Sequence, residues 1–213
     1  MLGYYAGRFA TVEINNTFYR MPRENVLHDW ASKVPESFRF AIKASQRITH
    51  HGRLKPEVAE SLSYFTRVTS ELGERRGPTL FQLPPNLKKD VPRLAAFLDL
   101  LPRRWPAAFE FRHETWFDDE VYGVLRDKGA ALVVADHDDF TTPVITTTTW
   151  CYARLHRAEY SAEELAEWAR RLGELGAGEY YIYFKHDEAR GSGPAGATEF
   201  RSLMTSAARR AEP

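Results

Sequence analysis

The chain has 213 residues, of which 43% are hydrophobic and 27% are charged, so it can bury the core of an ordinary globular domain. This composition excludes a chain that is disordered throughout. Lysine plus arginine total 29, and aspartate plus glutamate also total 29, so the excess positive charge of a nonspecific nucleic-acid binder is absent. Cys151 is the only cysteine, which excludes an internal disulfide framework and argues against a cysteine-based metal site.

The first residues, MLGYYAGRFA, lack the long apolar core of a signal peptide. No stretch approaches the roughly 18 consecutive apolar residues that cross a bilayer. We therefore expect a cytoplasmic protein that has no membrane partner.

The first expected strand is the run TVEINNTFY, residues 11–19. Its alternation predicts one polar face and one apolar face. The polar face would carry Glu13, Asn15, Thr17 and Tyr19. A strand with one packed face and one polar face is typical of a barrel.

Strands and helices then alternate along the chain. Apolar spacing and turn residues predict, in order, a helix at 23–34, a strand at 38–45, a helix at 56–72, a strand at 79–84, a helix at 90–101, a strand at 107–113, a helix at 118–129 and strands at 131–136 and 151–156. Ser161 and Glu164 form a capping-box signature for a helix that reaches about residue 175. The last strand is expected at 179–186, and an amphipathic helix at 197–210.

This order of elements indicates one α/β domain, residues 1–213, with parallel strands of the TIM-type (β/α) barrel. About seven strand units are visible, whereas a closed barrel has eight. We therefore expect that the chain is truncated at its N-terminus and that the missing strand would precede Met1.

Five segments of the chain resemble the YecE-like family, known as domain of unknown function 72. They are TVEINNTFYRMP, FRFAIKASQRITH, GPTLFQLPPN, FEFRHETWF and YARLH, in that order. The resemblance extends from residue 4 to about residue 187. It implies a TIM-type barrel related in shape to the endonuclease IV and xylose isomerase group, and it implies no particular reaction.

The chain departs from that family at both ends. Members of the family usually begin with a GTSGW-like strand and a loop ending in an FYP-like motif, and neither is present here. Many members carry a YFNND-like motif where this chain has YFKHD, residues 183–187, followed by the loop GSGPAGA. That glycine-rich loop lacks the lysine pattern of a phosphate-binding loop.

Polar residues lie near the end of each expected strand, where the functional groups of βα barrels are found. The candidate catalytic residues are Glu13, Glu110 and Asp136. The candidate substrate-binding residues are Asn15, Tyr19, Lys43, Gln82, Arg112, His113, Arg154, His156 and Lys185. His50 is expected at the rim of the site.

Two interpretations of these charges remain open. The carboxylates and cations could neutralise one another in a structural ion-pair network, since buried charges are costly unless they are paired. Alternatively, four cations (Lys43, Arg112, Arg154 and Lys185) would meet only three carboxylates (Glu13, Glu110 and Asp136). The excess cation, together with an arginine fork, would then bind a small anionic or phosphorylated ligand.

Three kinds of catalysis are compatible with these residues. Two carboxylates could act as acid and base on a glycosidic bond. Lys43 could form a Schiff base. A divalent metal could be held by histidines near strand ends with Glu110, Asp136 or Asp187, although no motif signals a metal or another cofactor. The histidines in question are His113, His137, His156 and His186.

The function that we expect is an enzyme of the hydrolase or lyase type that acts on a phosphodiester or a sugar phosphate. The alternative is a noncatalytic barrel that binds phosphate groups or a nucleic-acid backbone. The neutral net charge counts against long nucleic acids as partners.

Overall fold

A computed structural model describes residues 2–185 and 192–211. The chain forms two compact units, residues 1–130 and 131–213. The expectation that residues 1–213 form a single domain stays a prediction.

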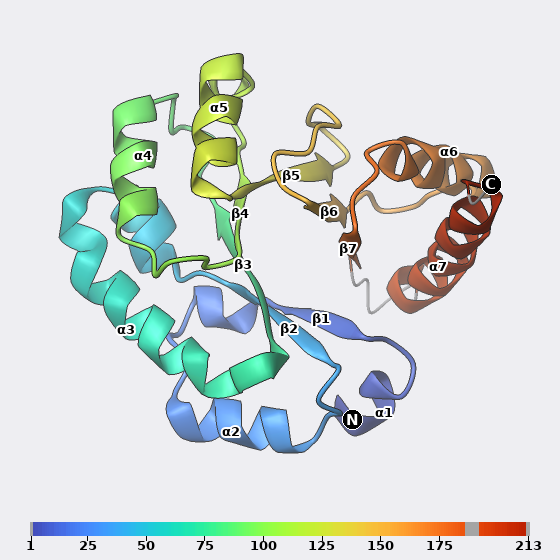
Figure 1. Ribbon diagram of the computed structural model, residues 1–213, viewed down its shortest axis with the longest axis horizontal. Coiled ribbons are helices and arrows are strands. Elements are labelled where there is room, and N and C mark those ends of the chain that lie inside the picture. Colours follow the sequence, from blue (N-terminus) through green and yellow to red (C-terminus); the bar gives the residue numbers. More distant parts are fainter. Residues whose placement is uncertain (1, 186–191, 212–213) are drawn as a thin grey trace. The chain divides into compact units, whose positions relative to one another are not determined.

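The first unit contains a parallel sheet whose strands follow chain order (Figure 1). Its strands are β1 (Thr11–Ile14), β2 (Arg39–Lys43), β3 (Arg76–Gln82) and β4 (Ala107–Glu110). Gln82 and Glu110, the last residues of β3 and β4, are register partners. The strands β3 and β4 are almost entirely buried, as expected of a parallel sheet that is covered by helices.

The helices of the first unit are α1 (Leu2–Ala6), α2 (Glu24–Ser32), α3 (Ala59–Thr69), α4 (Val91–Asp99) and α5 (Asp119–Lys128). The last two helices begin with side-chain caps. The Asp90 and Asp118 side chains accept backbone N–H groups at the starts of α4 and α5, and Gly129 ends α5 with a left-handed φ of 67°. The helices α4 and α5 lie side by side (Figure 1). The rings of Phe81 on β3 and Phe109 on β4 are stacked, with their centroids 5.1 Å apart.

The first strand is shorter than the sequence predicts. β1 ends at Ile14, and a 3₁₀ helix spans Asn16–Phe18, so the prediction that residues 11–19 form one strand is wrong beyond Ile14. The cause is Thr17, whose hydroxyl donates to the Ile14 carbonyl (3.2 Å) and to the Lys43 carbonyl (2.7 Å). Thr17 is therefore buried, whereas Tyr19 is 76% exposed, and the four polar residues do not share a strand face.

The second unit contains β5 (Ala131–Asp136), β6 (Trp150–Leu155) and β7 (Glu179–Phe184), again parallel and in chain order. Its helices are α6 (Ala162–Gly173) and α7 (Ser192–Ala211). The threonine-rich segment between β5 and β6 is a loop, as predicted. The hydroxyls of Thr142 and Thr147 accept the backbone N–H groups of Ala135 and Leu132, which fastens that loop to β5.

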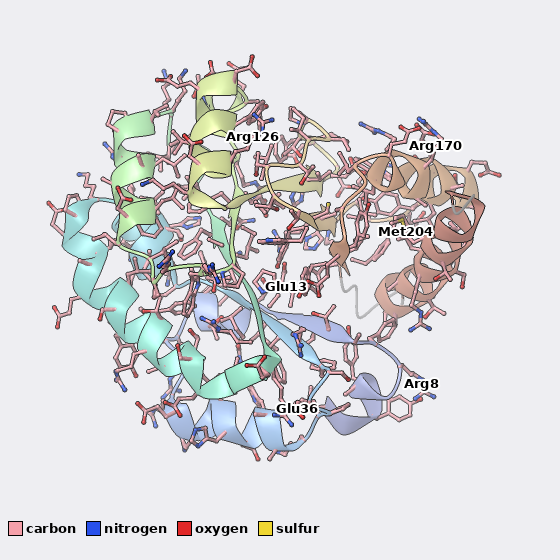
Figure 2. The ribbon with its side chains drawn as sticks, in the orientation of Figure 1. Arg8, Glu13, Glu36, Arg126, Arg170 and Met204 are labelled. Carbon is pink, nitrogen blue, oxygen red and sulfur yellow. The ribbon has the colours of Figure 1, made fainter. Side chains whose placement is uncertain are left out.

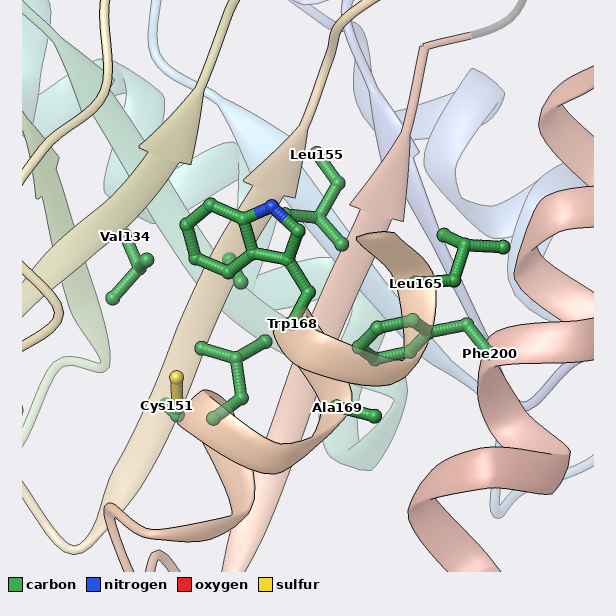
Figure 3. Packing of buried hydrophobic residues seen from close by; sticks show 9 residues of the cluster. Val134, Cys151, Leu155, Leu165, Trp168, Ala169 and Phe200 are labelled. Atoms are coloured by element: carbon green, nitrogen blue, oxygen red, sulfur yellow. The ribbon is translucent and has the colours of Figure 1, made fainter. Parts of the chain in front are cut away.

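The core of the second unit lies between β5–β7 and the two helices (Figure 3). It contains Trp168, Leu165 and Ala169 of α6, Phe200 of α7, and side chains from the strands. Trp168 is 5% exposed and Phe200 is 2% exposed. Trp168 is therefore a packing group between α6 and the strands.

The glycine-rich segment was wrongly expected to be a loop, because α7 begins at Ser192. Pro194 lies in the first turn of α7, where its missing N–H leaves no hydrogen bond unmade. The expected residues His186 and Asp187, with Gly191, lie outside the described residues. Among the described residues, none of the helices is both long enough and apolar enough to span a membrane.

The capping box of α6 is complete. The Ser161 hydroxyl accepts the Glu164 backbone N–H at 3.2 Å, and the Glu164 carboxylate accepts the Ser161 backbone N–H at 2.8 Å.

We predict that Ser161→Ala lowers the free energy of unfolding by about 1 kcal/mol, because the Glu164 N–H at the start of the helix loses its acceptor. Urea titration followed by circular dichroism measures this change. Ser63→Ala, an exposed serine inside α3, is the control and should change stability by less than about 0.5 kcal/mol; equal effects would contradict the role of the cap.

Cys151 is 3% exposed within the core of the second unit, and burial raises the pKa of its thiol to about 12. Because the thiolate is the reactive form, we predict that the native protein does not react with a thiol reagent such as Ellman's reagent at pH 8. Guanidinium-unfolded protein should release one equivalent of chromophore. Full reaction of the native protein within minutes would show that this core is open.

Candidate functional site

Four side chains make a continuous chain of contacts across the C-terminal ends of β2, β3 and β4. The Lys43 ammonium donates to Gln82 Oε1 at 2.8 Å, and Gln82 Nε2 donates to Glu110 Oε1 at 2.8 Å. The same Glu110 oxygen lies 3.7 Å from Arg112 Nε. We call Lys43, Gln82, Glu110 and Arg112 the polar relay. A cation therefore stands at each end of a buried amide–carboxylate bridge.

The burial of the polar relay falls from its centre to its ends. Glu110 is 0% exposed and Gln82 is 8% exposed, while Lys43 and Arg112 are half-buried. A buried carboxylate is stable only if its oxygens are paired or hydrogen-bonded. Gln82 and Arg112 meet that need, and the two cationic ends remain accessible to solvent.

An aromatic group adjoins the lysine end of the polar relay. The Lys43 ammonium lies 4.3 Å from the centre of the Phe18 ring, a cation–π contact. The Phe18 and His50 rings meet edge to face, with ring centroids 4.9 Å apart. The 3₁₀ helix that carries Phe18 is fastened to the end of β2 by Thr17, so Lys43, Phe18 and His50 form one packed group.

His50 lies in a single π-helical segment, Arg47–His51, which follows β2. Such segments are rare, and they occur frequently at functional sites. Burial lowers the pKa of His50 below its ordinary value, and the positive charges of Lys43, His51, Arg112 and Arg53 lower it further. His50 is therefore neutral at pH 7, and the surroundings of its ring are cationic.

The other candidates in the first unit lie around this group. Glu13 is on β1 (Figure 2), and its Oε1 accepts Asn15 Nδ2 at 2.9 Å, so this predicted pair is in contact. Tyr19 extends into solvent from the end of the 3₁₀ helix. His113 caps the short 3₁₀ helix Glu114–Trp116, because its Nδ1 accepts the Thr115 N–H at 3.3 Å. β4 ends at Glu110, so Arg112 and His113 lie beyond the strand in which they were predicted.

In the second unit Asp136 has three partners. Its Oδ1 accepts the Thr141 hydroxyl at 2.6 Å, and its Oδ2 accepts the Tyr160 hydroxyl at 2.9 Å. Arg157 Nε lies 3.0 Å from Oδ2, and the Arg157 guanidinium also donates to Glu164 at 2.7 Å. These contacts pair both oxygens of the Asp136 carboxylate, whose residue is only 4% exposed.

Arg157 and Tyr160 are site residues that the sequence reasoning missed. Arg157 directly follows His156 at the end of β6, which was a signal available in the sequence. Tyr160 precedes the capping box of α6 and gave no polar signal of its own. The count of four cations against three carboxylates was therefore incomplete, because it omitted both Arg157 and Glu164.

The remaining candidates of the second unit lie on or after its strands. Arg154 is on β6 and is 4% exposed. His156 follows β6, and its ring lies 5.6 Å from that of His137. Lys185 follows β7 and is exposed. Their roles in binding stay predictions. Within residues 2–185 and 192–211, no three His, Cys, Asp or Glu side chains gather as metal ligands would.

The fold class predicted from the sequence is confirmed. The chain has an α/β fold of the TIM type, with parallel strands in chain order inside each unit. A sugar phosphate isomerase/epimerase of Parabacteroides distasonis ATCC 8503 shares this fold, with a TM-score of 0.55 at 13% identity over 100% of this chain and 89% of that chain. At this identity the likeness concerns the fold alone.

The chain belongs to the DUF72 family, described as a protein family of unknown function, which it matches over residues 1–213. It is 33% identical over 138 residues to the UPF0759 protein YecE of Escherichia coli strain K12, covering 62% of this chain and 50% of YecE. The chain thus aligns with about half the length of that curated relative.

Two solved structures of DUF72 proteins are similar to this chain. That of Thermotoga maritima MSB8 has a TM-score of 0.79 at 29% identity, with 98% of this chain and 88% of the other covered. That of Enterococcus faecalis V583 has a TM-score of 0.84 at 19% identity, with 96% and 93% covered. These comparisons confirm the family and the fold that the sequence motifs indicated.

Gln82 is the link on which the polar relay depends. We predict that Gln82→Met lowers the free energy of unfolding by about 1–3 kcal/mol, because Glu110 keeps its charge inside the protein and loses a donor. Urea titration measures the change. The control is Gln46→Met, in the segment after β2, which makes no side-chain hydrogen bond within the described part of the chain and should have little effect. Equal stability of the Gln82 variant and the native protein would contradict the bridging role.

Proposed function

We propose that this chain is an enzyme of the hydrolase or lyase type that acts on a phosphate-bearing small molecule. The observation that carries the proposal is the polar relay, in which the cations Lys43 and Arg112 flank a buried carboxylate at the C-terminal ends of three adjacent strands. Ligands of βα barrels bind at this end of the strands.

The electrostatics favour an anion as the ligand. Burial lowers the pKa of His50, and four basic residues, Lys43, His51, Arg112 and Arg53, lower it further. An anion placed there would lower the energy of the whole group. Lysine and arginine are the side chains that bind phosphate, the lysine as a point charge and the arginine through its fork of N–H donors.

Glu110 supports chemistry in addition to binding. Its carboxylate lies between Gln82 and Arg112, so a phosphate held by Arg112 would lie close to a group that can take or give a proton. Glu13, with Asn15 as its neighbour, is a second carboxylate at the end of an adjacent strand. We assign acid or base roles to these two residues, and anion binding to Lys43 and Arg112.

A noncatalytic barrel that binds phosphate groups is the second candidate. It is favoured by one observation, the close pairing of the candidate carboxylates: Asp136 contacts Thr141, Tyr160 and Arg157, and Glu110 contacts Gln82 and Arg112. Carboxylates held in this way resemble members of a structural ion-pair network. The net charge of zero counts against a long nucleic acid as the ligand.

A thermal-unfolding scan with added ligands tests the proposal. We predict that a sugar phosphate at about one hundred times its dissociation constant adds about 2.7 kcal/mol of stability, which raises the midpoint. Lys43→Met should abolish the shift. Lys33→Met removes a surface lysine of the same unit, paired with Asp29, and should keep it. A shift caused only by an oligonucleotide, or by no phosphate compound, would contradict a small phosphate-bearing ligand.

The variant Glu110→Gln separates the enzyme from the binding barrel. The amide keeps the size of the side chain and removes its charge, so circular dichroism must first show that the variant folds. If the variant keeps the rise in unfolding midpoint that the sugar phosphate causes but no longer converts that compound, the result supports catalysis by Glu110. Turnover equal to that of the native protein would remove Glu110 from the reaction.

A further inference from the structure

The segment that carries His50 is held firmly after β2. The Gly52 N–H donates to the Arg47 carbonyl at 2.9 Å, and a Cβ added at Gly52 would lie 2.1 Å from Val58 Cγ1. Arg53 and Leu54 follow with left-handed φ values of 50° and 59°, which is costly for residues other than glycine. The segment is therefore tightly packed, and it places His50 against Phe18.

The hydrogen bonds of His50 leave one ring nitrogen for a ligand. Its Nδ1 lies 2.9 Å from the Thr49 hydroxyl. The alternative acceptor for that hydroxyl, the Ser45 carbonyl, is 3.4 Å away and already accepts the Ile48 N–H at 2.9 Å. The Thr49 hydroxyl can donate to either acceptor, and Nδ1 is paired with Thr49 in both arrangements. Within the described residues His50 Nε2 makes no hydrogen bond.

The charged groups around His50 come from several elements. Lys43 ends β2 and lies over the other part of the Phe18 ring, and Arg112 follows β4. His51 and Arg53 belong to the same segment as His50. Glu110 is paired with Arg112 and Gln82. Protonation of His50 adds a positive charge beside these cations and is thus unfavourable while the site holds no anion.

We propose that His50 is a proton-coupled member of the anion site: it is neutral when the site is empty and takes up a proton when an oxyanion binds near Lys43 and Arg112. This inference rests on the proposed anion site and adds to it a residue and a pH dependence. The anion offsets the positive charges, so the imidazolium becomes favourable. Its Nε2–H then donates a charge-assisted hydrogen bond to the anion.

The sign of the pH dependence follows from linkage. If the bound state holds His50 with a higher pKa than the free state, binding is accompanied by proton uptake and strengthens as the pH falls. Below both pKa values the gain is about tenfold in affinity for each unit by which the anion raises the pKa. Sulfate is the suitable probe, because it does not change its own charge over this range.

The experiment combines nuclear magnetic resonance and titration calorimetry on the full chain. The ring signals of His50, assigned with the variant His50→Gln, are titrated with and without sulfate. We expect a free pKa below 6.5, an upward shift when sulfate is added, and tighter sulfate binding at pH 5.5 than at pH 8. In His50→Gln the affinity ratio between the two pH values should fall toward one.

Two lysine variants test the electrostatic cause without any ligand. Lys43→Met should raise the pKa of His50 in the free protein, because it removes a nearby positive charge. Lys33→Met should leave that pKa unchanged. Sulfate binding that is equal at both pH values, with an unmoved His50 pKa, would overturn this inference alone. Absence of sulfate binding would overturn the anion site and this inference with it.

Discussion

The buried carboxylate of Glu110 is the constraint on which the rest of the candidate site depends. A charge with no exposure to water must be paired, and the pairing fixes Gln82 on β3 and Arg112 after β4. Gln82 in turn directs the Lys43 ammonium, because its amide oxygen accepts one N–H bond from that group. One buried charge thus organises polar side chains from three neighbouring strands.

Phe18 and His50 adjoin the lysine end of the polar relay. Lys43 contacts the face of the Phe18 ring, and the Phe18 and His50 rings meet edge to face, so side-chain contacts link the end of the polar relay to the π-helical segment after β2. In the second unit Asp136 plays a comparable part, since Thr141, Tyr160 and Arg157 all bind its carboxylate. Each unit therefore contains its own carboxylate-centred cluster.

The fold class could be predicted from the alternation of elements along the sequence, and three of the four residues of the polar relay from the ends of its apolar runs. The predicted strands 38–45, 79–84 and 107–113 extend two or three residues beyond the observed strand ends, which are Lys43, Gln82 and Glu110. These three residues were nevertheless among the candidates, because each is a polar residue at the end of an apolar run. The course of residues 15–19 could not be predicted, because a long-range bond from Thr17 to the Lys43 carbonyl decides it. Arg157 was missed for a similar reason: its partner Asp136 is 21 residues away in sequence and meets it only through the pairing of β5 with β6.

The central claim is that an oxyanion binds between Lys43 and Arg112. The most direct measurement is a crystal structure of the protein soaked with selenate, whose anomalous scattering identifies the anion without ambiguity. The account predicts an anomalous peak within hydrogen-bond distance of both the Lys43 ammonium and the Arg112 guanidinium. A fully occupied selenate elsewhere on the protein, with no peak between these two residues, would contradict it.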